Sequence, residues 1–409
     1  MVLAAGQLHM ADQIVLIGYF LVMLGIGAYF YRFMRRMRDY FSGGNAIPWW
    51  LSGASFYMSS FSVFGFVVYS ALAYQYGWVA ITIFWSYIPG TLLCTYVFSK
   101  RWRRARIDSP IEYLEARFSP AMRQVCAWPG IPVKIIDDAL KLVAIGIFFS
   151  VSLGLSVNQS MLGSGLIMLA YTFMGGLWAV VVTDFVQFIV MSAAVVVLFV
   201  LSLVKTGGVA GFVESAPAGA FHLIHEEYGV LYIASMVFLY AVAMSSVHWQ
   251  LIQRFCCVPD EREGRKMGLL VVVLQFITPV IMFLPAMAAR QFLGADINPR
   301  QIYPELCTHL LPAGLLGLMI AAMFAATMSM LSSDYNACAN VVTNDVYRRL
   351  LRPRASQQEL VLVGRVATLL IGSLALGAAF VMAGGGGGGL FARWVQGFSG
   401  AAGAVGAPL

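Results

Sequence analysis

A row of polar side chains in one apolar segment could bind a cation. The segment MSMLSSDYNACAN, residues 328–340, follows the apolar run GLLGLMIAAMFAAT with no Gly or Pro between them. At the rotation of an α-helix, five of its polar side chains fall within about 80° of one another. They are Ser329, Ser332, Ser333, Asn336 and Asn340. The spacing therefore predicts a continuous polar stripe along one face of a helix.

Asp184 is the acid that could complete a cation site with this stripe. It lies in the apolar segment WAVVVTDFVQFIV and has no oppositely charged neighbour at helical spacing. Carboxylate and hydroxyl oxygens, without thiolate or imidazole, suit a hard cation. We therefore predict a sodium site formed by Asp184, Ser329, Ser332 and Ser333. The alternative is that the serines donate to carbonyl groups of their own helix; the unpaired acid and the length of the stripe favour sodium.

Further charges lie in a second apolar segment, residues 126–155. They are Lys134, Asp137, Asp138 and Lys141. Their spacing predicts two ion pairs four residues apart, Lys134 with Asp138 and Asp137 with Lys141. Asp334 points about 100–140° away from Ser329 and so lies off the polar stripe. The sequence names no partner for Asp334.

The segments that carry these residues belong to a polytopic membrane protein. Of the 409 residues, 60% are hydrophobic and only 11% are charged, and the mean hydropathy is +0.79. A bilayer needs about 20 apolar residues per helical crossing, whereas a soluble protein of this size needs far more surface charge. Apolar windows predict eleven spans, the last cut short by the end of the chain. They are 14–32, 48–75, 78–99, 126–155, 159–175, 178–203, 229–252, 267–290, 314–345, 359–383 and 391–409.

The basic residues predict the orientation of these spans. Four Lys and Arg follow the first span, seven follow the third, and four each lie in 254–266 and 348–354. These segments fall in alternate loops, and only four Lys and Arg lie in the loops on the opposite side of the membrane. Because Lys and Arg gather in cytoplasmic loops, we predict a cell (inner) membrane protein with its N-terminus outside and its Arg-rich loops cytoplasmic. The net charge of +7 is then a topology signal, and no nucleic-acid partner is expected.

Two spans are interrupted by polar residues near their centres. The second, PWWLSGASFYMSSFSVFGFVVYSALAYQYG, is too long for one straight crossing, and its middle carries Ser52, Ser55, Ser59, Ser60, Ser62 and Gly65. The seventh contains AMSSVHWQ near its centre. Ser and Gly can simply ease tight helix packing. Two such spans five crossings apart instead predict an inverted repeat whose broken helices form a binding site. We expect one transporter domain over 1–409, with an extra helix at 14–32 and repeats at 48–203 and 229–409.

Three stretches resemble motifs of the sodium:solute symporter family. They are SPIEYLEARF at 109–118, YTFMGGLWAVVVTDFVQ at 171–187 and AATMSMLSSDYNACANVVTNDVY at 325–347. IQRF at 252–255 is similar to the family's cytoplasmic Gln-Arg pair after the first helix of the second repeat. The resemblance spans nearly the whole chain. It implies an all-α, leucine-transporter-type fold of 5+5 inverted repeats preceded by one extra helix, with further helices beyond the last residue.

The resemblance also implies two sodium sites. The common site uses backbone carbonyls that match Met58, Phe61 and Ala326, together with two adjacent hydroxyls. The first hydroxyl is Ser329, but the second falls on Met330, so this site is expected to be weakened. The additional site matches Asp184, Ser329, Ser332 and Ser333 in full, and we expect it to couple transport to sodium.

Substrate positions carry over less completely from the family. The expected substrate-binding residues are Ser62, Gly65, Tyr74, Asp137 and His248. In the sialic acid carriers an Arg of the fourth span receives the substrate carboxylate. Asp137 occupies that position here. It disfavours an anionic solute unless Lys134 or Lys141 binds the solute's carboxylate instead. The remaining aromatic residues favour a neutral polyhydroxy compound, whose apolar face can stack on their rings. They are Phe61, Tyr69, Tyr74, Trp78 and Trp249.

Together these features predict a sodium-coupled symporter that imports a small polar solute, preferably a sugar or related compound, by alternating access. Its expected partners are the solute, sodium as the coupling ion and the lipid bilayer, with no cofactor; a monomer is compatible with the sequence. Alternatives are proton coupling through Asp184 or Asp334, a sialic acid, amino acid or carboxylate symporter of the same fold, and a transporter-like membrane sensor. An enzyme is not expected, because His248 lacks a nucleophile and an acid at suitable spacing.

Overall fold

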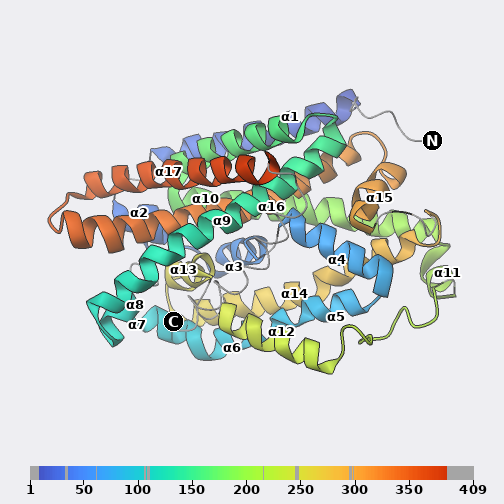
Figure 1. The fold of residues 1–409 in the computed structure, drawn as a ribbon, viewed down its shortest axis with the longest axis horizontal. Helices are drawn as coiled ribbons and strands as arrows, with labels where there is room; N and C mark the ends of the chain where they lie inside the picture. Colours follow the sequence, from blue (N-terminus) through green and yellow to red (C-terminus); the bar gives the residue numbers. More distant parts are fainter. Residues whose placement is uncertain are drawn as a thin grey trace.

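The computed structural model describes residues 9–32, 36–60, 62–105, 107, 111–214, 216–244, 248–293, 297 and 299–384. Every regular element in these ranges is a helix (Figure 1). The helices of the N-terminal half are α1 (Met10–Tyr31), α2 (Met37–Ser42), η1 (Gly43–Asn45), α3 (Trp49–Met58), α4 (Val63–Tyr76), α5 (Val79–Trp85), α6 (Tyr87–Leu93), η2 (Cys94–Phe98), α7 (Ser99–Ala105), α8 (Glu112–Arg117), α9 (Pro120–Leu153) and α10 (Val157–Lys205). Those that follow are α11 (Gly208–Glu214), α12 (Val230–Val242), α13 (Trp249–Cys257), α14 (Glu261–Ala289), η4 (Pro299–Gln301), α15 (Ile302–Leu310), α16 (Leu315–Val341), η5 (Val342–Leu351) and α17 (Gln357–Gly384).

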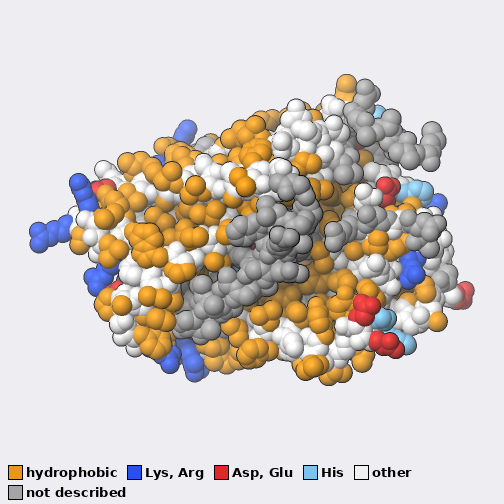
Figure 2. All heavy atoms as spheres, viewed as in Figure 1, with side chains coloured by type: hydrophobic (Ala, Val, Ile, Leu, Met, Phe, Trp, Pro, Cys, Tyr) orange, Lys and Arg blue, Asp and Glu red, His pale blue; other side chains and the backbone are white. Residues whose placement is uncertain are grey.

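Six helical segments within the described ranges are long and apolar enough to cross a membrane. They are Met10–Tyr31, Val79–Ala105, Gly176–Lys205, Glu261–Ala289, Leu315–Leu351 and Gln357–Gly384. The other predicted spans up to residue 384 are helical but broken, shorter or more polar, and the predicted span 391–409 lies outside the described residues. Figure 2 shows hydrophobic side chains over the middle of the visible face, with most of its Lys and Arg at one end.

The predicted interruption of the second span separates α3 from α4. Helix α3 ends at Met58 and α4 begins at Val63. The break exposes backbone and side-chain polar groups, which need partners inside a membrane. Helix α16 supplies them: the Val63 amide donates to Thr327 Oγ1 at 3.1 Å, and Ser59 Oγ lies 2.8 Å from Ser333 Oγ. Hydrogen bonds therefore hold the break between α3 and α4 against α16, the helix that carries the polar stripe.

The second predicted interruption lies between α12, which ends at Val242, and α13, which begins at Trp249. Residues 245–247 lie outside the described residues. Two predicted spans, 159–175 and 178–203, form the two arms of α10, which is kinked at Gly176. Gly176 has φ 56° and ψ −162°, and a Cβ there would meet Tyr40 Cδ2 at 2.7 Å. A glycine is required by both the backbone conformation and the close packing.

Helix α16 lies at the centre of the protein, in contact with α1, α9, α10 and α17 (Figure 1). All five side chains of the predicted polar stripe are buried in it, from Ser329 to Asn340. Asn336 accepts a hydrogen bond from Gln253 at 3.0 Å, and Asn340 accepts one from Asn344 at 2.5 Å. The stripe therefore faces other helices of the protein rather than lipid.

Two basic residues that the charge pattern assigned to cytoplasmic loops are buried. Arg254 in α13 is 0% exposed, and Arg123 in the first turn of α9 is almost as inaccessible. Each is held by acidic side chains, Arg254 by Asp184 and Arg123 by Glu115. Their burial was not predicted, because the number of charges in a segment does not reveal which of them are neutralised by a distant partner.

Candidate functional site

Asp184 lies on α10 where α3 and α13 meet it. The carboxylate is fully buried and accepts a hydrogen bond from the Ser55 hydroxyl of α3 through Oδ2. The guanidinium Nη2 of Arg254, on α13, lies 3.5 Å from the same oxygen. The prediction that Asp184 has no charged partner was therefore wrong, because packing brings Arg254 to it from 70 residues along the chain.

Arg254 connects Asp184 to α16, the helix that carries the polar stripe. Its Nε donates to Ser55 Oγ at 2.7 Å and its Nη2 donates to Ser333 Oγ at 2.6 Å. One guanidinium thus reaches the helices that carry Asp184, Ser55 and Ser333. The sequence contained this residue in the motif IQRF, but nothing in the motif indicated that the side chain turns inward.

Two oxygen atoms beside this ion pair are buried and have no hydrogen-bond partner. They are Asp184 Oδ1 and Ser329 Oγ. The Ser329 hydroxyl approaches the same carboxylate from α16, but the two groups do not reach the geometry of a hydrogen bond. Ser332 donates to the Ser329 carbonyl at 3.0 Å, the within-helix bond that was the alternative to ion binding. A carboxylate and a hydroxyl with spare lone pairs in a buried setting are suitable ligands for a sodium ion.

Three residues of the predicted common sodium site lie in the described part of the chain. Met58, Ala326 and Ser329 are buried at the contact between the α3–α4 break and α16. Phe61 lies outside the described residues. Met330 is half-buried and lines a cavity together with Ser60 and Ser62, and its thioether offers no hydroxyl to this site.

A cluster of five charges joins α9 to α16. Lys141 Nζ lies 2.7 Å from Asp137 Oδ2, 2.9 Å from Asp138 Oδ1 and 2.8 Å from Asp334 Oδ2. Lys134 Nζ lies 2.9 Å from Asp334 Oδ1. The predicted pair of Asp137 with Lys141 is confirmed. The predicted pair of Lys134 with Asp138 is wrong, because Lys134 contacts Asp334, the acid for which the sequence named no partner.

A cavity of about 340 Å³ lies next to this cluster, within the size range of small-molecule sites. Its lining includes Ser62, Gly65 and Asp137 of the predicted substrate residues. Ser60, Tyr69, Phe84, Lys141, Met330 and three more tyrosines also line it, namely Tyr87, Tyr232 and Tyr240. These last three were not predicted from the sequence, because tyrosine is also common at membrane interfaces.

The other two predicted substrate residues lie elsewhere. Tyr74 lines a different cavity of about 390 Å³, where the Arg290 guanidinium lies 5.7 Å from its ring centroid. His248 is at the start of α13 and lines neither cavity, and its Nδ1 is buried without a hydrogen-bond partner. The family resemblance thus selected three residues of one cavity and two outside it.

Comparison with known proteins assigns the family. A sequence profile described as "Sodium:solute symporter family" matches residues 40–409. The chain belongs to the sodium:solute symporter family. The resemblance carried by the three sequence motifs is thereby confirmed, and the family consists of transporters rather than enzymes.

The relatives of this symporter include carriers of different solutes. The sodium/sialic acid symporter SiaT of Proteus mirabilis is 27% identical over 384 residues, covering 90% of this chain and 77% of the relative. The sodium/myo-inositol cotransporter 2 of Sus scrofa is 28% identical over 412 residues, covering 89% and 60%. The sodium/glucose cotransporter of Vibrio parahaemolyticus is 26% identical over 400 residues, covering 89% and 73%.

A solved structure has the same fold as this symporter. It is a substrate-bound, outward-open state of a Na⁺-coupled sialic acid symporter, with a TM-score of 0.86 and 24% sequence identity. The alignment covers 97% of this chain and 87% of that one. The predicted all-α, leucine-transporter-type fold is confirmed.

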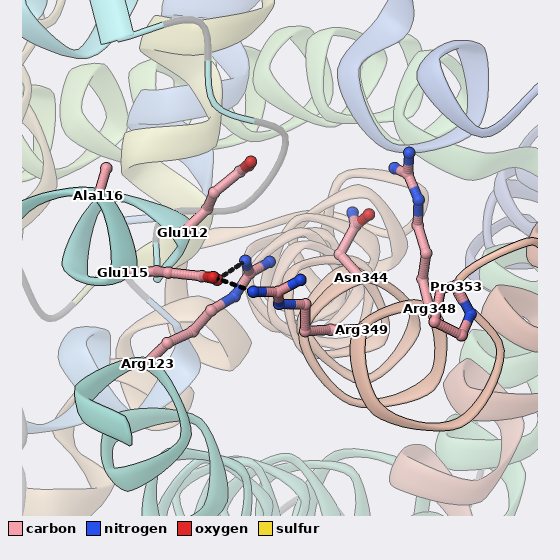
Figure 3. Close-up of a pocket in the computed structure, with 8 residues that line it drawn as sticks. All are labelled: Glu112, Glu115, Ala116, Arg123, Asn344, Arg348, Arg349 and Pro353. Carbon is pink, nitrogen blue, oxygen red and sulfur yellow. Dashed lines mark hydrogen bonds and ion pairs between the residues drawn. The ribbon is translucent and has the colours of Figure 1, made fainter. Parts of the chain in front are cut away.

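The symporter also has an ion-pair network near residues 112–123. Glu115 of α8 lies between Arg123 of α9 and Arg349 of η5, beside a cavity of about 440 Å³ (Figure 3). Arg123 Nη1 is 2.5 Å from Glu115 Oε2, and Arg123 also forms an ion pair with Asp345. Arg349 forms an ion pair with Glu115. The hydrogen bond from Arg123 holds the pKa of Glu115 below its usual value. The network joins α8, which lies in the SPIEYLEARF stretch, to η5, which directly follows α16.

Replacement Glu115→Gln is expected to lower stability at neutral pH by about 1–2 kcal/mol, because one charged acceptor of two arginines is lost. A carboxyl whose pKa is lowered by folding stabilises the protein above its ordinary pKa and loses that contribution as the pH falls through the lowered value. The difference in apparent Tm between the two proteins should therefore shrink in acid, measured by a thermal melt in detergent. Glu226→Gln, an exposed acid, is the matched control; an equal effect of both changes contradicts the assignment.

Proposed function

We propose that this symporter couples the entry of sodium to the import of a small polar organic solute, with the coupling sodium held by Asp184, Ser329, Ser332 and Ser333. The observation that carries the proposal is the pair of buried oxygens without partners, Asp184 Oδ1 and Ser329 Oγ. A buried polar atom without a partner is costly, and a cation between a carboxylate and a hydroxyl removes that cost.

Arg254 links sodium binding at Asp184 to the packing of the surrounding helices. One carboxylate cannot fully neutralise both a guanidinium and a sodium ion, so sodium at Asp184 competes with Arg254 for the acid. Arg254 also donates to Ser55 and Ser333. Weakening the pair therefore changes how α3, α13 and α16 are held together. Sodium occupancy then shifts the balance between conformations that bind the solute with different affinity.

The solute binds in the cavity that Ser62, Gly65 and Asp137 line. Hydroxyl groups, tyrosine rings and a volume of about 340 Å³ favour a compound of the size of a sugar or a related polyhydroxy molecule. Relatives named as sialic acid, glucose and myo-inositol transporters support this size class. No resident cofactor takes part in this mechanism.

For orientation, we propose an outside N-terminus in a cell (inner) membrane. Most of the Lys and Arg on the visible face lie at one end of the protein, as expected for a cytoplasmic end (Figure 2). The proposed repeats, 48–203 and 229–409, each begin with a helix that the structure shows as two pieces, α3 with α4 and α12 with α13.

Uptake into proteoliposomes tests the coupling. We expect solute uptake to rise with an inward sodium gradient and to fall to the level of empty vesicles when potassium replaces sodium at equal ionic strength. Uptake that follows a pH gradient and ignores sodium supports the proton-coupled alternative. Uptake that responds to neither gradient excludes both forms of symport.

A further inference from the structure

The charge cluster between α9 and α16 carries one more acid than base. It contains three carboxylates, Asp137, Asp138 and Asp334, and two ammonium groups, Lys134 and Lys141. Within the described ranges, no other Lys or Arg forms an ion pair with these acids. The Oδ2 atom of Asp138 is buried and has no hydrogen-bond partner. The cluster therefore has one more carboxyl group than it has lysines, and it has an unused acceptor on Asp138.

Asp137 is the acid of this cluster that faces the cavity. Its side chain is 22% exposed, whereas those of Asp138 and Asp334 are fully buried. Asp137 lines the cavity and the other two acids do not. Lys141 lines it as well, but its ammonium lies within 2.9 Å of all three carboxylates, so its charge is already compensated.

Electron-rich rings form much of the remaining wall. Tyr69, Phe84, Tyr87, Tyr232 and Tyr240 all line the cavity. The Tyr87 and Tyr240 rings are stacked with centroids 3.6 Å apart, and the Tyr69 and Tyr240 hydroxyls lie 3.3 Å apart. Aromatic faces attract organic cations, and they do so more strongly when water is excluded. A carboxylate facing such rings is a site for a positively charged nitrogen.

A bare metal ion fits this place less well. The oxygen atoms of Asp137, Asp138 and Asp334 lie within 4.8 Å of one another, a spacing that could hold a metal. Lys141 Nζ contacts all three, so a tethered cation already takes this position. The carboxylate that is open to the cavity is that of Asp137, where a ligand of larger size has room.

We propose that the transported solute carries a positively charged amine beside its hydroxyl groups, as in an amino sugar or an amino alcohol. Its ammonium group pairs with Asp137 and lies against the tyrosine rings, while its hydroxyls contact Ser60 and Ser62. This proposal rests on the proposed function, because it assigns the solute of the same cavity. The expected solute is then a polyhydroxy compound that carries an amine, rather than the neutral polyhydroxy compound that the sequence favoured.

Matched solutes test the charge preference in the unsubstituted protein. Glucosamine, glucose and glucuronate share one ring and differ in charge; choline and 3,3-dimethylbutan-1-ol form a second pair of equal shape. Binding to the purified protein in sodium buffer is measured by calorimetry. We expect at least one cationic member to bind at least about tenfold more tightly than its neutral partner, and glucuronate to bind weakest. Equal binding within both sets, or no binding of any cationic member at millimolar concentration, overturns the proposal.

Variants then assign the preference to one side chain. Asp137→Asn should remove the advantage of the cationic solute, Asp137→Glu should keep it, and Glu226→Gln, which removes an exposed acid, should leave it unchanged. An advantage that survives Asp137→Asn also overturns the proposal. If Asp137→Asn does not fold, the comparison of matched solutes still decides. The shift in melting temperature caused by sodium alone is a separate measurement, and its absence counts against sodium coupling without affecting the charge preference.

Discussion

Asp184→Asn is expected to abolish the stimulation of uptake by sodium. The change keeps the shape of the side chain and removes the charge that faces Ser329 and Arg254. Loss of a buried charge partner typically costs 2 kcal/mol or more, so we expect sodium affinity to fall by more than about tenfold. Sodium-induced thermal stabilisation and sodium-dependent uptake both measure this effect. Sodium stimulation that remains intact in the variant contradicts the proposed site.

The same change leaves Arg254 buried without its acid, which can impair folding by itself. The double variant Asp184→Asn with Arg254→Gln removes that unpaired charge. We expect it to recover thermal stability but not the response to sodium. For the hydroxyl ligand, Ser329→Ala should weaken the response, whereas Ser164→Ala should not. Ser164 is a buried α10 serine that donates to the carbonyl of Ser160 in its own helix.

Asp334→Asn is expected to produce the largest loss of stability among the variants discussed. Asp334 is the partner that both lysines share, and Lys134 forms no other ion pair in the described part of the chain. Removing one partner of a buried ion pair costs about 3–5 kcal/mol, because the remaining charge stays buried. A thermal melt in detergent should show the loss as a lower apparent Tm.

The double variant Asp334→Asn with Lys134→Met tests the physical cause. If the unpaired ammonium is responsible, replacing it by an apolar side chain of similar length restores most of the lost stability. Lys134→Met alone should cost less than Asp334→Asn, because Asp334 keeps its contact with Lys141. A double variant that is no more stable than Asp334→Asn shows that the loss has another origin.

The sequence predicted correctly the features that depend on local periodicity. The polar stripe of α16 and the pair of Asp137 with Lys141 follow from the geometry of one helix. The break after Met58 follows from serines in a segment too long for one crossing. These features need no knowledge of neighbouring helices.

Only the tertiary structure decided which charges meet. Arg254 reaches Asp184 across 70 residues of chain, and Lys134 reaches Asp334 across 200. Periodicity specifies the face of a helix on which a side chain lies, but not the helix that packs against that face. In a membrane interior a buried charge needs a partner, so each acid's function depends on the cation that the fold brings to it. The sequence by itself therefore determined the class, the serine stripe and the candidate acids, and the packing of α9, α10, α13 and α16 determined their partners.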